Sequence, residues 1–326
     1  TNPGNYVRLT RMIFRRQIVL FLLLFFAFPA LGHAVWIWTP ETGKFINPKM
    51  SVKSTPKEQL EFARSFMEGK KYPEAISEFK KLIRHYPRAK EAPEAQYYIG
   101  QIQEELNKPY EAYKAYQVVI DKYPFSERAG EIVQLQYDIG DQLLEGKNKH
   151  GKWMEVIIGG DEKVITVFRS VIKNAPYGKF AAVSQYKIGL YLQEKGLYQE
   201  ARDEFEKTAN DYPTSDWAKA AKFQIAMADS KRSSDVQHEQ KVTDIALEGF
   251  QEFIKTHPES ELTPDAKEQI SRLRDKEAQN NFLIAEFYEK QKNPKAAKVY
   301  YKDIIDRYAD TSWASKALAR LKTIGG

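Results

Sequence analysis

Apolar residues recur along this chain at helical spacing, in short segments that end close to a proline. Five apolar positions between residues 95 and 106 lie three or four residues apart, and Asn107-Lys108-Pro109 then interrupts them. Five more follow between residues 112 and 123 and end at Pro124. This spacing places apolar side chains on one face of an α-helix. Residues 95–124 therefore predict two amphipathic helices joined by a short polar turn, an αα-hairpin.

The second helix of this hairpin has five further copies along the chain. In each copy a small or β-branched residue is followed four positions later by a large aromatic residue. The six aromatic residues are Phe79, Tyr116, Phe168, Phe205, Phe250 and Tyr301. Prolines at 87, 124, 176, 213 and 258 close five of the copies, in steps of 37, 52, 37 and 45 residues. The shortest step is close to the ~34-residue period of tetratricopeptide repeats. We therefore predict an all-α, right-handed tetratricopeptide-repeat solenoid of about six αα-hairpins, with the six aromatic residues in its core.

The first helix of the hairpin carries the phrase Gln-Tyr-x-Ile-Gly at 96–100, 136–140 and 185–189. A glycine at the end of this phrase is expected where two helix axes approach closely. The residue three positions earlier lies at the opposite edge of the apolar face. Reading that position through all repeats gives a set that we call the first-helix column: Leu60, Tyr97, Tyr137, Tyr186, Phe223 and Phe282.

The first-helix column has two interpretations. Aromatic rings offer a large contact area at low entropic cost, and tyrosine adds a hydrogen-bonding hydroxyl, so the column suits an extended client peptide on the concave face. Alternatively, the rings pack between adjacent first helices as part of the core. We expect the inner parts of the rings to pack. We further expect the hydroxyls of Tyr97, Tyr137 and Tyr186 to contact a bound polypeptide.

The amino-terminal part of the chain differs from the repeats. Arg15-Arg16 precedes an apolar run from Ile18 to Phe28, and Gly32-His33-Ala34 is a small-x-small site. These features are typical of a secretory signal peptide. The run is 11 residues long, short of the ~20 that span a bilayer. We predict that 1–34 is an upstream extension and signal peptide, cleaved after Ala34; retention as a membrane anchor is the alternative.

The remaining boundaries follow from turn-forming and polar residues. Residues 35–56 contain three prolines and a Thr-Gly turn signal, which predict an extended or hairpin-like arm. The tryptophans of this arm either pack on the first repeat or dock on a partner or membrane surface. Residues 57–326 form the predicted solenoid, with insertions at 146–160 and 230–241. The absence of glycine and proline after Pro264 predicts one long helix that reaches about Lys292.

Composition excludes several classes of function. The net charge of +6 includes four arginines before residue 35, so residues 35–326 carry 6 − 4 = +2. That value does not indicate nucleic-acid binding. The chain has no cysteine, which excludes disulfides, cysteine-bound zinc and thiol catalysis. No His-Glu-x-x-His, Gly-x-Ser-x-Gly or phosphate-binding glycine loop occurs in the sequence. We expect a protein without enzymatic activity, cofactor or metal.

Several phrases resemble the BamD-type outer-membrane β-barrel assembly lipoproteins. They are Tyr72-Pro73-Glu74-Ala75-Ile76, Asp211-Tyr212-Pro213-Thr214-Ser215, Trp217-Ala218, and Arg274-Asp275-Lys276 leading into Ala285-Glu286-Phe287-Tyr288. The resemblance covers roughly residues 56–323 at the level of repeat architecture. It implies a non-enzymatic, periplasmic partner of the barrel-inserting pore protein that helps to receive unfolded outer-membrane polypeptides.

One departure from the BamD-type pattern concerns anchoring. Members of that family carry a cysteine at the mature amino terminus, whereas here Leu31-Gly32 is followed by His33. We therefore expect no lipid anchor, and any association with the outer membrane would depend on protein contacts. The alternative function is a soluble periplasmic adaptor that coordinates cell-envelope or division machinery.

Overall fold

The computed structural model describes residues 37–39, 43–46, 51–150, 160–235 and 240–325. The predicted signal peptide and residues 151–159 of the first predicted insertion lie outside these ranges. The chain divides into two compact units, residues 1–95 and 96–326. The boundary falls within helix α4 (Glu91–Glu105).

The described residues form helices almost throughout, with one pair of short strands. Strands β1 (Ile37–Thr39) and β2 (Lys44–Ile46) precede α2 (Pro56–Glu68), α3 (Tyr72–His85) and α4. The second unit continues with α5 (Pro109–Lys122), α6 (Ala129–His150), α8 (Gly160–Asn174), α9 (Ala181–Glu194), α10 (Tyr198–Asp211), α11 (Asp216–Asp235), α12 (Gln240–Thr256), α13 (Thr263–Lys290), α14 (Pro294–Arg307) and α15 (Ser312–Gly325).

Within the predicted arm, residues 37–39 and 44–46 pair as an antiparallel β-hairpin. Trp38 lies opposite Phe45, and Gly43 supplies a positive φ of 62° in the turn. Trp38 is 51% exposed and Phe45 66% exposed, so their rings are not buried against the first repeat. Trp36 lies outside the described residues. Helix α2 begins where the sequence predicted, because the side chain of Thr55 accepts a hydrogen bond from the Glu58 amide and caps the helix.

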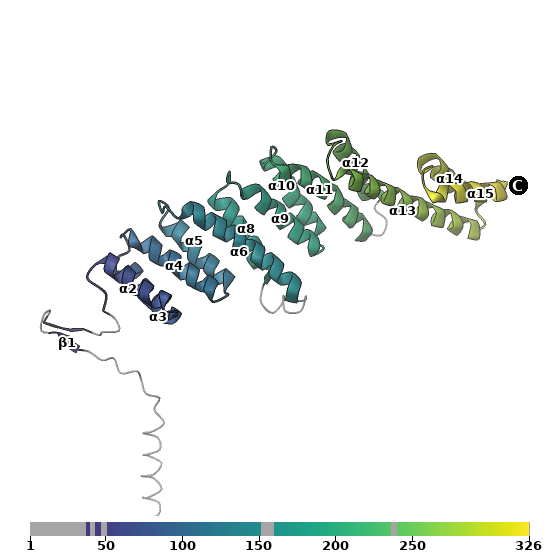
Figure 1. Cartoon of the computed structure of the whole chain (residues 1–326). Helices are drawn as coiled ribbons and strands as arrows, with labels where there is room; N and C mark the ends of the chain where they lie inside the picture. Colours follow the sequence, from purple (N-terminus) through teal and green to yellow (C-terminus); the bar gives the residue numbers. More distant parts are fainter. Residues whose placement is uncertain (1–36, 40–42, 47–50, 151–159, 236–239, 326) are drawn as a thin grey trace, which may run out of the picture. The chain divides into compact units, whose positions relative to one another are not determined.

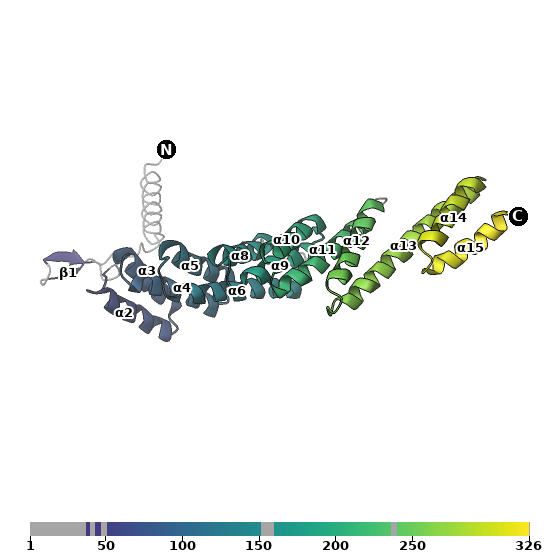
Figure 2. The ribbon, with the colours of Figure 1, turned by 90° about the horizontal axis from the view of Figure 1, so that it is seen from above.

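The second unit consists of successive αα-hairpins. Helices α6 and α8, α9 and α10, α11 and α12, and α13 and α14 pack in pairs, and each pair packs on the next element in chain order (Figures 1 and 2). Because paired helices are antiparallel, the turns within hairpins lie at one edge of the array and the turns between hairpins at the other. In Figure 1 the turns after α5, α8 and α10 all lie along the upper edge.

The turns inside the hairpins use the left-handed backbone conformation. Asn107, Gly196 and Lys292 have φ of 54°, 77° and 57°, each just after the end of a first helix. The amide after each of them bonds back to the helix; for example, the Lys108 amide donates to the Gln103 carbonyl at 2.9 Å. A left-handed residue followed by such a bond ends a helix abruptly and turns the chain back. This geometry explains the short polar gaps in the sequence.

The predicted core is confirmed. All six aromatic residues of the second helices, Phe79, Tyr116, Phe168, Phe205, Phe250 and Tyr301, have 0% exposure. The glycines of the Gln-Tyr-x-Ile-Gly phrase lie directly against three of these rings. A Cβ atom on Gly100 would stand 2.3 Å from Tyr116 Cε1, and one on Gly189 would stand 2.5 Å from Phe205 Cε1. Glycine at these positions allows the rings to reach the facing helix.

Amide side chains fix the register within the hairpins. A glutamine near the start of a first helix donates a hydrogen bond to the second helix 19 residues later. The pairs are Gln59 with the Glu78 carbonyl at 3.1 Å, Gln96 with the Ala115 carbonyl at 3.0 Å, and Gln185 with the Glu204 carboxylate. Buried polar groups that lose a partner are costly, so a slip of one residue is disfavoured.

The two predicted insertions are smaller than the sequence indicated. Helix α11 continues to Asp235, so residues 230–235 of the predicted 230–241 loop are helical. An ion pair of 3.0 Å between Arg232 and the buried Asp229 supports this extension. Likewise α6 extends to His150 and α8 begins at Gly160, so only residues 151–159 separate them. In contrast, the predicted long helix is confirmed as α13.

The buried carboxyl group of Glu277 in α13 should make the stability of the folded chain depend on pH. Glu277 is 9% exposed, and one of its oxygens accepts a hydrogen bond of 2.9 Å from the Tyr308 hydroxyl. Burial raises the pKa of Glu277 above its ordinary value of 4.5, against the effect of that hydrogen bond. The folded state therefore holds the proton more tightly than the unfolded state, and stability falls as pH rises above 4.5 through the folded pKa.

Replacing Glu277 by glutamine removes this titration. The quantity to compare is the free energy of unfolding of the Glu277→Gln variant minus that of the parent chain. We expect this difference to be larger near pH 8 than near pH 4.5. Urea unfolding of both chains at the two pH values measures the difference, since all other titrations are common to both. Equal differences at the two pH values would show that Glu277 does not titrate in the folded state.

Candidate peptide-binding surface

Most of the first-helix column is buried. The exposed fractions are 3% for Tyr97, 8% for Tyr186, 7% for Phe223 and 8% for Phe282, whereas Leu60 and Tyr137 are half-buried. The rings pack on the core aromatics of the second helices: Tyr97 lies 5.6 Å from Tyr116, and Tyr186 lies 5.4 Å from Phe205, between ring centroids. These four rings therefore belong to the core, as the packing interpretation predicted.

A second set of side chains covers the column from the following repeat. Phe180 stacks on Tyr137 at 4.5 Å, Trp217 lies 5.1 Å from Tyr186, and Trp313 lies 5.3 Å from Phe282. The Arg128 guanidinium lies 4.5 Å from the centre of the Tyr97 ring. We call Arg128, Phe180, Trp217 and Trp313 the cover residues. Each follows the closing position of the preceding second helix by four residues, and this spacing is the sequence signal that marks them.

The hydroxyls of the three column tyrosines reach polar side chains on the next first helix. Tyr97 donates a hydrogen bond of 2.5 Å to Glu131 of α6. The Lys187 ammonium of α9 lies 4.9 Å from the centre of the Tyr137 ring of α6, and burial raises the pKa of the Tyr186 hydroxyl against a smaller, opposing effect of Gln224 of α11. The three tyrosines thus each interact with a polar side chain of the next first helix.

The electrostatics of this surface follow from these contacts. Hydrogen bonds from Tyr97 and then Arg128 lower the pKa of the Glu131 carboxyl, so Glu131 is a stable anion at neutral pH. Burial, and then the contact with Glu131, raises the pKa of the Tyr97 hydroxyl. Lys187 forms an ion pair with Asp141, and the Gln193 side chain donates a hydrogen bond of 3.1 Å to Gln224. The first helices therefore present fixed, alternating donors and acceptors beside the buried rings.

Two further observations concern the part of the chain that the structure describes. No group of three or more His, Cys, Asp or Glu side chains there is placed to hold a metal ion. Within the same ranges, every helix is too short or too polar to span a bilayer.

The repeated hairpins, left-handed turns and interlocked aromatic rings define a tetratricopeptide-repeat protein. Two family models of the tetratricopeptide repeat match residues 60–127 and 183–215. A third model, YfiO, described as an outer membrane lipoprotein family, matches residues 227–324, which include α13 and α14. The predicted all-α tetratricopeptide-repeat fold is confirmed.

Two curated relatives are outer membrane protein assembly factors named BamD. The protein of Caulobacter vibrioides is 26% identical over 189 residues, which cover 58% of this chain and 58% of the relative. That of Rickettsia prowazekii is 31% identical over 124 residues, which cover 38% of this chain and 49% of the relative. The chain thus spans about half the length of the curated relatives it matches. The predicted resemblance to BamD-type assembly factors is confirmed.

Solved structures of tetratricopeptide-repeat proteins also align with the chain. A repeat protein of Bacteroides fragilis is 13% identical, covers 68% of this chain with 99% of its own, and has a TM-score of 0.44. One from Parabacteroides merdae is 15% identical, covers 76% of this chain with 91% of its own, and has a TM-score of 0.32.

Proposed function

We propose that this chain is a non-catalytic periplasmic scaffold of outer-membrane protein assembly that binds partner proteins and extended outer-membrane polypeptides. The observation that carries the proposal is the YfiO match over residues 227–324, together with the two BamD relatives. The fold supports a scaffold, because an array of hairpins offers a long, continuous binding surface.

The proposed binding surface is the polar face of the first helices. The rings of the column are mainly buried, so an extended polypeptide would meet Glu131, Lys187 and Gln224 rather than the rings themselves. Tyr97 holds Glu131, Asp141 holds Lys187, and Gln193 holds Gln224. Fixed donors and acceptors along successive helices suit the backbone of an extended peptide, because less side-chain entropy is lost on binding.

Replacing Tyr97, Tyr137 and Tyr186 together by phenylalanine tests this surface. The rings remain, so we expect the fold to persist, while affinity for an unfolded outer-membrane polypeptide falls about five- to tenfold, the effect of one or two modest hydrogen bonds. Fluorescence anisotropy with a labelled client peptide measures the affinity. A matched control replaces Tyr123 and Tyr212, which lie outside the column, by phenylalanine. Equal affinities for all three chains would contradict the proposed surface.

A depletion experiment tests the wider function. On depletion of the chain, we expect folded outer-membrane β-barrels to decline while other envelope proteins persist. A pull-down from envelope extracts should recover the barrel-assembly machinery. Recovery of division proteins or peptidoglycan instead, with unchanged barrel levels, would favour the adaptor function.

A further inference from the structure

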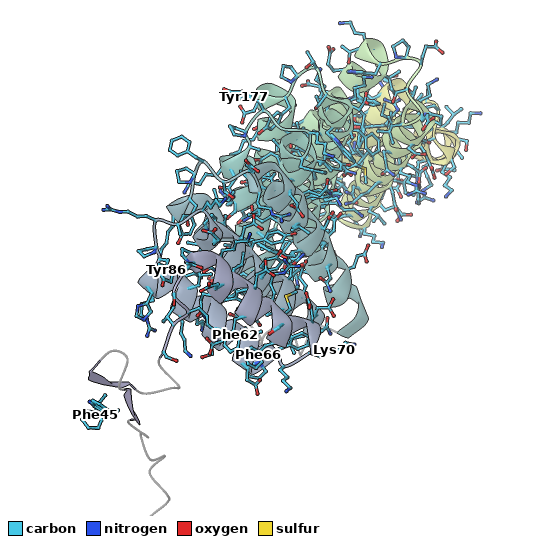
Figure 3. All side chains as sticks on the ribbon, turned by 60° about the vertical axis from the view of Figure 1, so that its left-hand side comes forward. Phe45, Phe62, Phe66, Lys70, Tyr86 and Tyr177 are labelled. Atoms are coloured by element: carbon cyan, nitrogen blue, oxygen red, sulfur yellow. The ribbon has the colours of Figure 1, made fainter. Side chains whose placement is uncertain are left out.

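Two aromatic side chains stand almost completely in solvent at turns between hairpins. Phe125 is 98% exposed and Tyr177 is 97% exposed. Figure 3 shows Tyr177 directed away from the helices. Each residue directly follows a closing proline, Pro124 or Pro176. The next most exposed large apolar side chain among the described residues, Phe45, reaches only 66%. Both rings therefore contribute nothing to packing within the chain.

The two turns are neighbours on one edge of the second unit. Helices α5 and α8, which lead into them, are hydrogen-bonded to each other. The hydroxyls of Tyr113 and Ser170 are 2.7 Å apart, and the Asn174 side chain donates a hydrogen bond of 2.9 Å to Gln117. Asn174 is the last residue of α8, and Gln117 lies five residues before the end of α5, so the end of α8 lies beside the carboxy-terminal half of α5.

The turn itself does not require an aromatic residue. One hydrogen bond, from the amide two residues after the proline to the carbonyl of the residue before it, is common to five turns. The pairs are Ala89 to Tyr86, Ser126 to Tyr123, Gly178 to Ala175, Ser215 to Tyr212 and Ser260 to His257, at 2.9 to 3.1 Å. The other three turns carry Arg88, Thr214 and Glu259 where two carry the rings.

The charges beside the rings are also distinctive. Residues 173–180 contain Lys173 and Lys179, both exposed, and no acidic residue. Residues 121–128 are balanced, since Lys122 and Arg128 offset Asp121 and Glu127. The eight residues in the same register of the later turns, 210–217 and 255–262, carry net charges of −2 and 1 − 2 = −1. The turn of Tyr177 is therefore positive and the turn of Phe125 neutral, whereas the two later turns are negative.

We propose that the turns at 123–126 and 175–178 form a membrane-contact edge that binds an anionic phospholipid bilayer. Phe125 and the ring of Tyr177 enter the boundary between headgroups and acyl chains, where aromatic side chains are favoured. Lys173 and Lys179 lie against lipid phosphates, and each such lysine adds to the attraction of an anionic surface. Two isolated rings on protruding turns suit a fluid interface, because the lipids rearrange around them. This inference is independent of the proposed client surface on the first helices.

The absence of cysteine from the chain makes a local test possible. Single cysteines at Phe125, Tyr177, Thr214 or Glu259 each receive an environment-sensitive fluorophore in the full chain. The last two are controls at the same turn position. With vesicles of phosphatidylethanolamine and phosphatidylglycerol, we expect emission at 125 and 177 to move to shorter wavelength and to be quenched by spin-labelled acyl chains. Emission at 214 and 259 should not change.

The apolar segment 18–28 could also bind vesicles. A fluorophore at 125 or 177 reports only on lipid contact at its own turn and so distinguishes the two kinds of binding. The variant Lys173→Gln/Lys179→Gln should reduce the response at 125 and 177 on anionic vesicles and leave the response on phosphatidylcholine vesicles unchanged. In unlabelled protein, Phe125→Ser/Tyr177→Ser should weaken partition onto anionic vesicles by about tenfold, since two exposed rings are lost. No response at 125 and 177, equal responses at all four positions, or a response only to added envelope proteins would overturn the proposal.

Discussion

Replacing Phe205 by alanine is expected to lower the free energy of unfolding by about 3–5 kcal/mol, the usual cost of removing a fully buried ring. Phe205 has 0% exposure and lies between Tyr186 and Gly189 of the facing helix. Its removal leaves a cavity between α9 and α10 that neither helix can close, because the Gln185 to Glu204 hydrogen bond holds their register. Urea unfolding followed by circular dichroism gives the value.

Tyr177→Ala is the matched control for this truncation. It also removes an aromatic ring, but from a side chain that is 97% exposed, and its free energy of unfolding should change by less than about 0.5 kcal/mol. A loss below about 1 kcal/mol for Phe205→Ala, with an unchanged denaturant slope, would contradict the assignment of this ring to the core.

The opposite change, Gly189→Ala, adds one methyl group and is expected to lower the free energy of unfolding by about 1–3 kcal/mol or more. The new Cβ would stand 2.5 Å from Cε1 of Phe205, closer than carbon atoms approach, and the buried ring has little room to move. Gly130→Ala is the control, because a Cβ there meets nothing within 4 Å. Alanine has a higher helix propensity than glycine, so the Gly130→Ala variant should be as stable as the parent chain or more stable by up to about 1 kcal/mol.

A double variant tests whether the ring causes the effect of Gly189→Ala. In a Phe205→Leu background, the smaller side chain leaves room for the added methyl group. The cost of Gly189→Ala should therefore fall, and the two changes should cost less together than the sum of their separate costs. If the costs of Gly189→Ala and Phe205→Leu simply add, contact with the Phe205 ring is not the cause of the destabilisation.

The fold was predictable from the sequence because each hairpin repeats the same local signals. The four-residue spacing, as from Ala201 to Phe205, fixes which face is buried, and a proline marks the end of five of the six second helices. The α11 extension was missed because residues 230–235 are polar and show no apolar period. The contact that fixes Asp229 just before them, an ion pair of 3.1 Å with Arg202 of α10, is tertiary and cannot be read from local sequence.

The burial of the first-helix column could not be predicted from periodicity alone. Periodicity places Tyr137 and Tyr186 at one edge of a helix, but it does not show what lies against that edge. Here the next repeat supplies Phe180 and Trp217 as covers. The exposed pair of the membrane-contact edge was missed for the opposite reason. Phe125 and Tyr177 fall in turns, where no apolar period marks them.

The uninterrupted course of α13 has a consequence for how the chain opens. Its first half supplies Ala266 and Leu273 to the core of the fifth hairpin, and its second half supplies Ala278 and Phe282 to the core of the sixth. At 28 residues it forms a rod about 42 Å long. Earlier hairpins are joined by short turns and can lose their hydrogen bonds one hairpin at a time. The last two share a backbone, so their amides should exchange with solvent together, as one cooperative segment at the carboxy-terminal end.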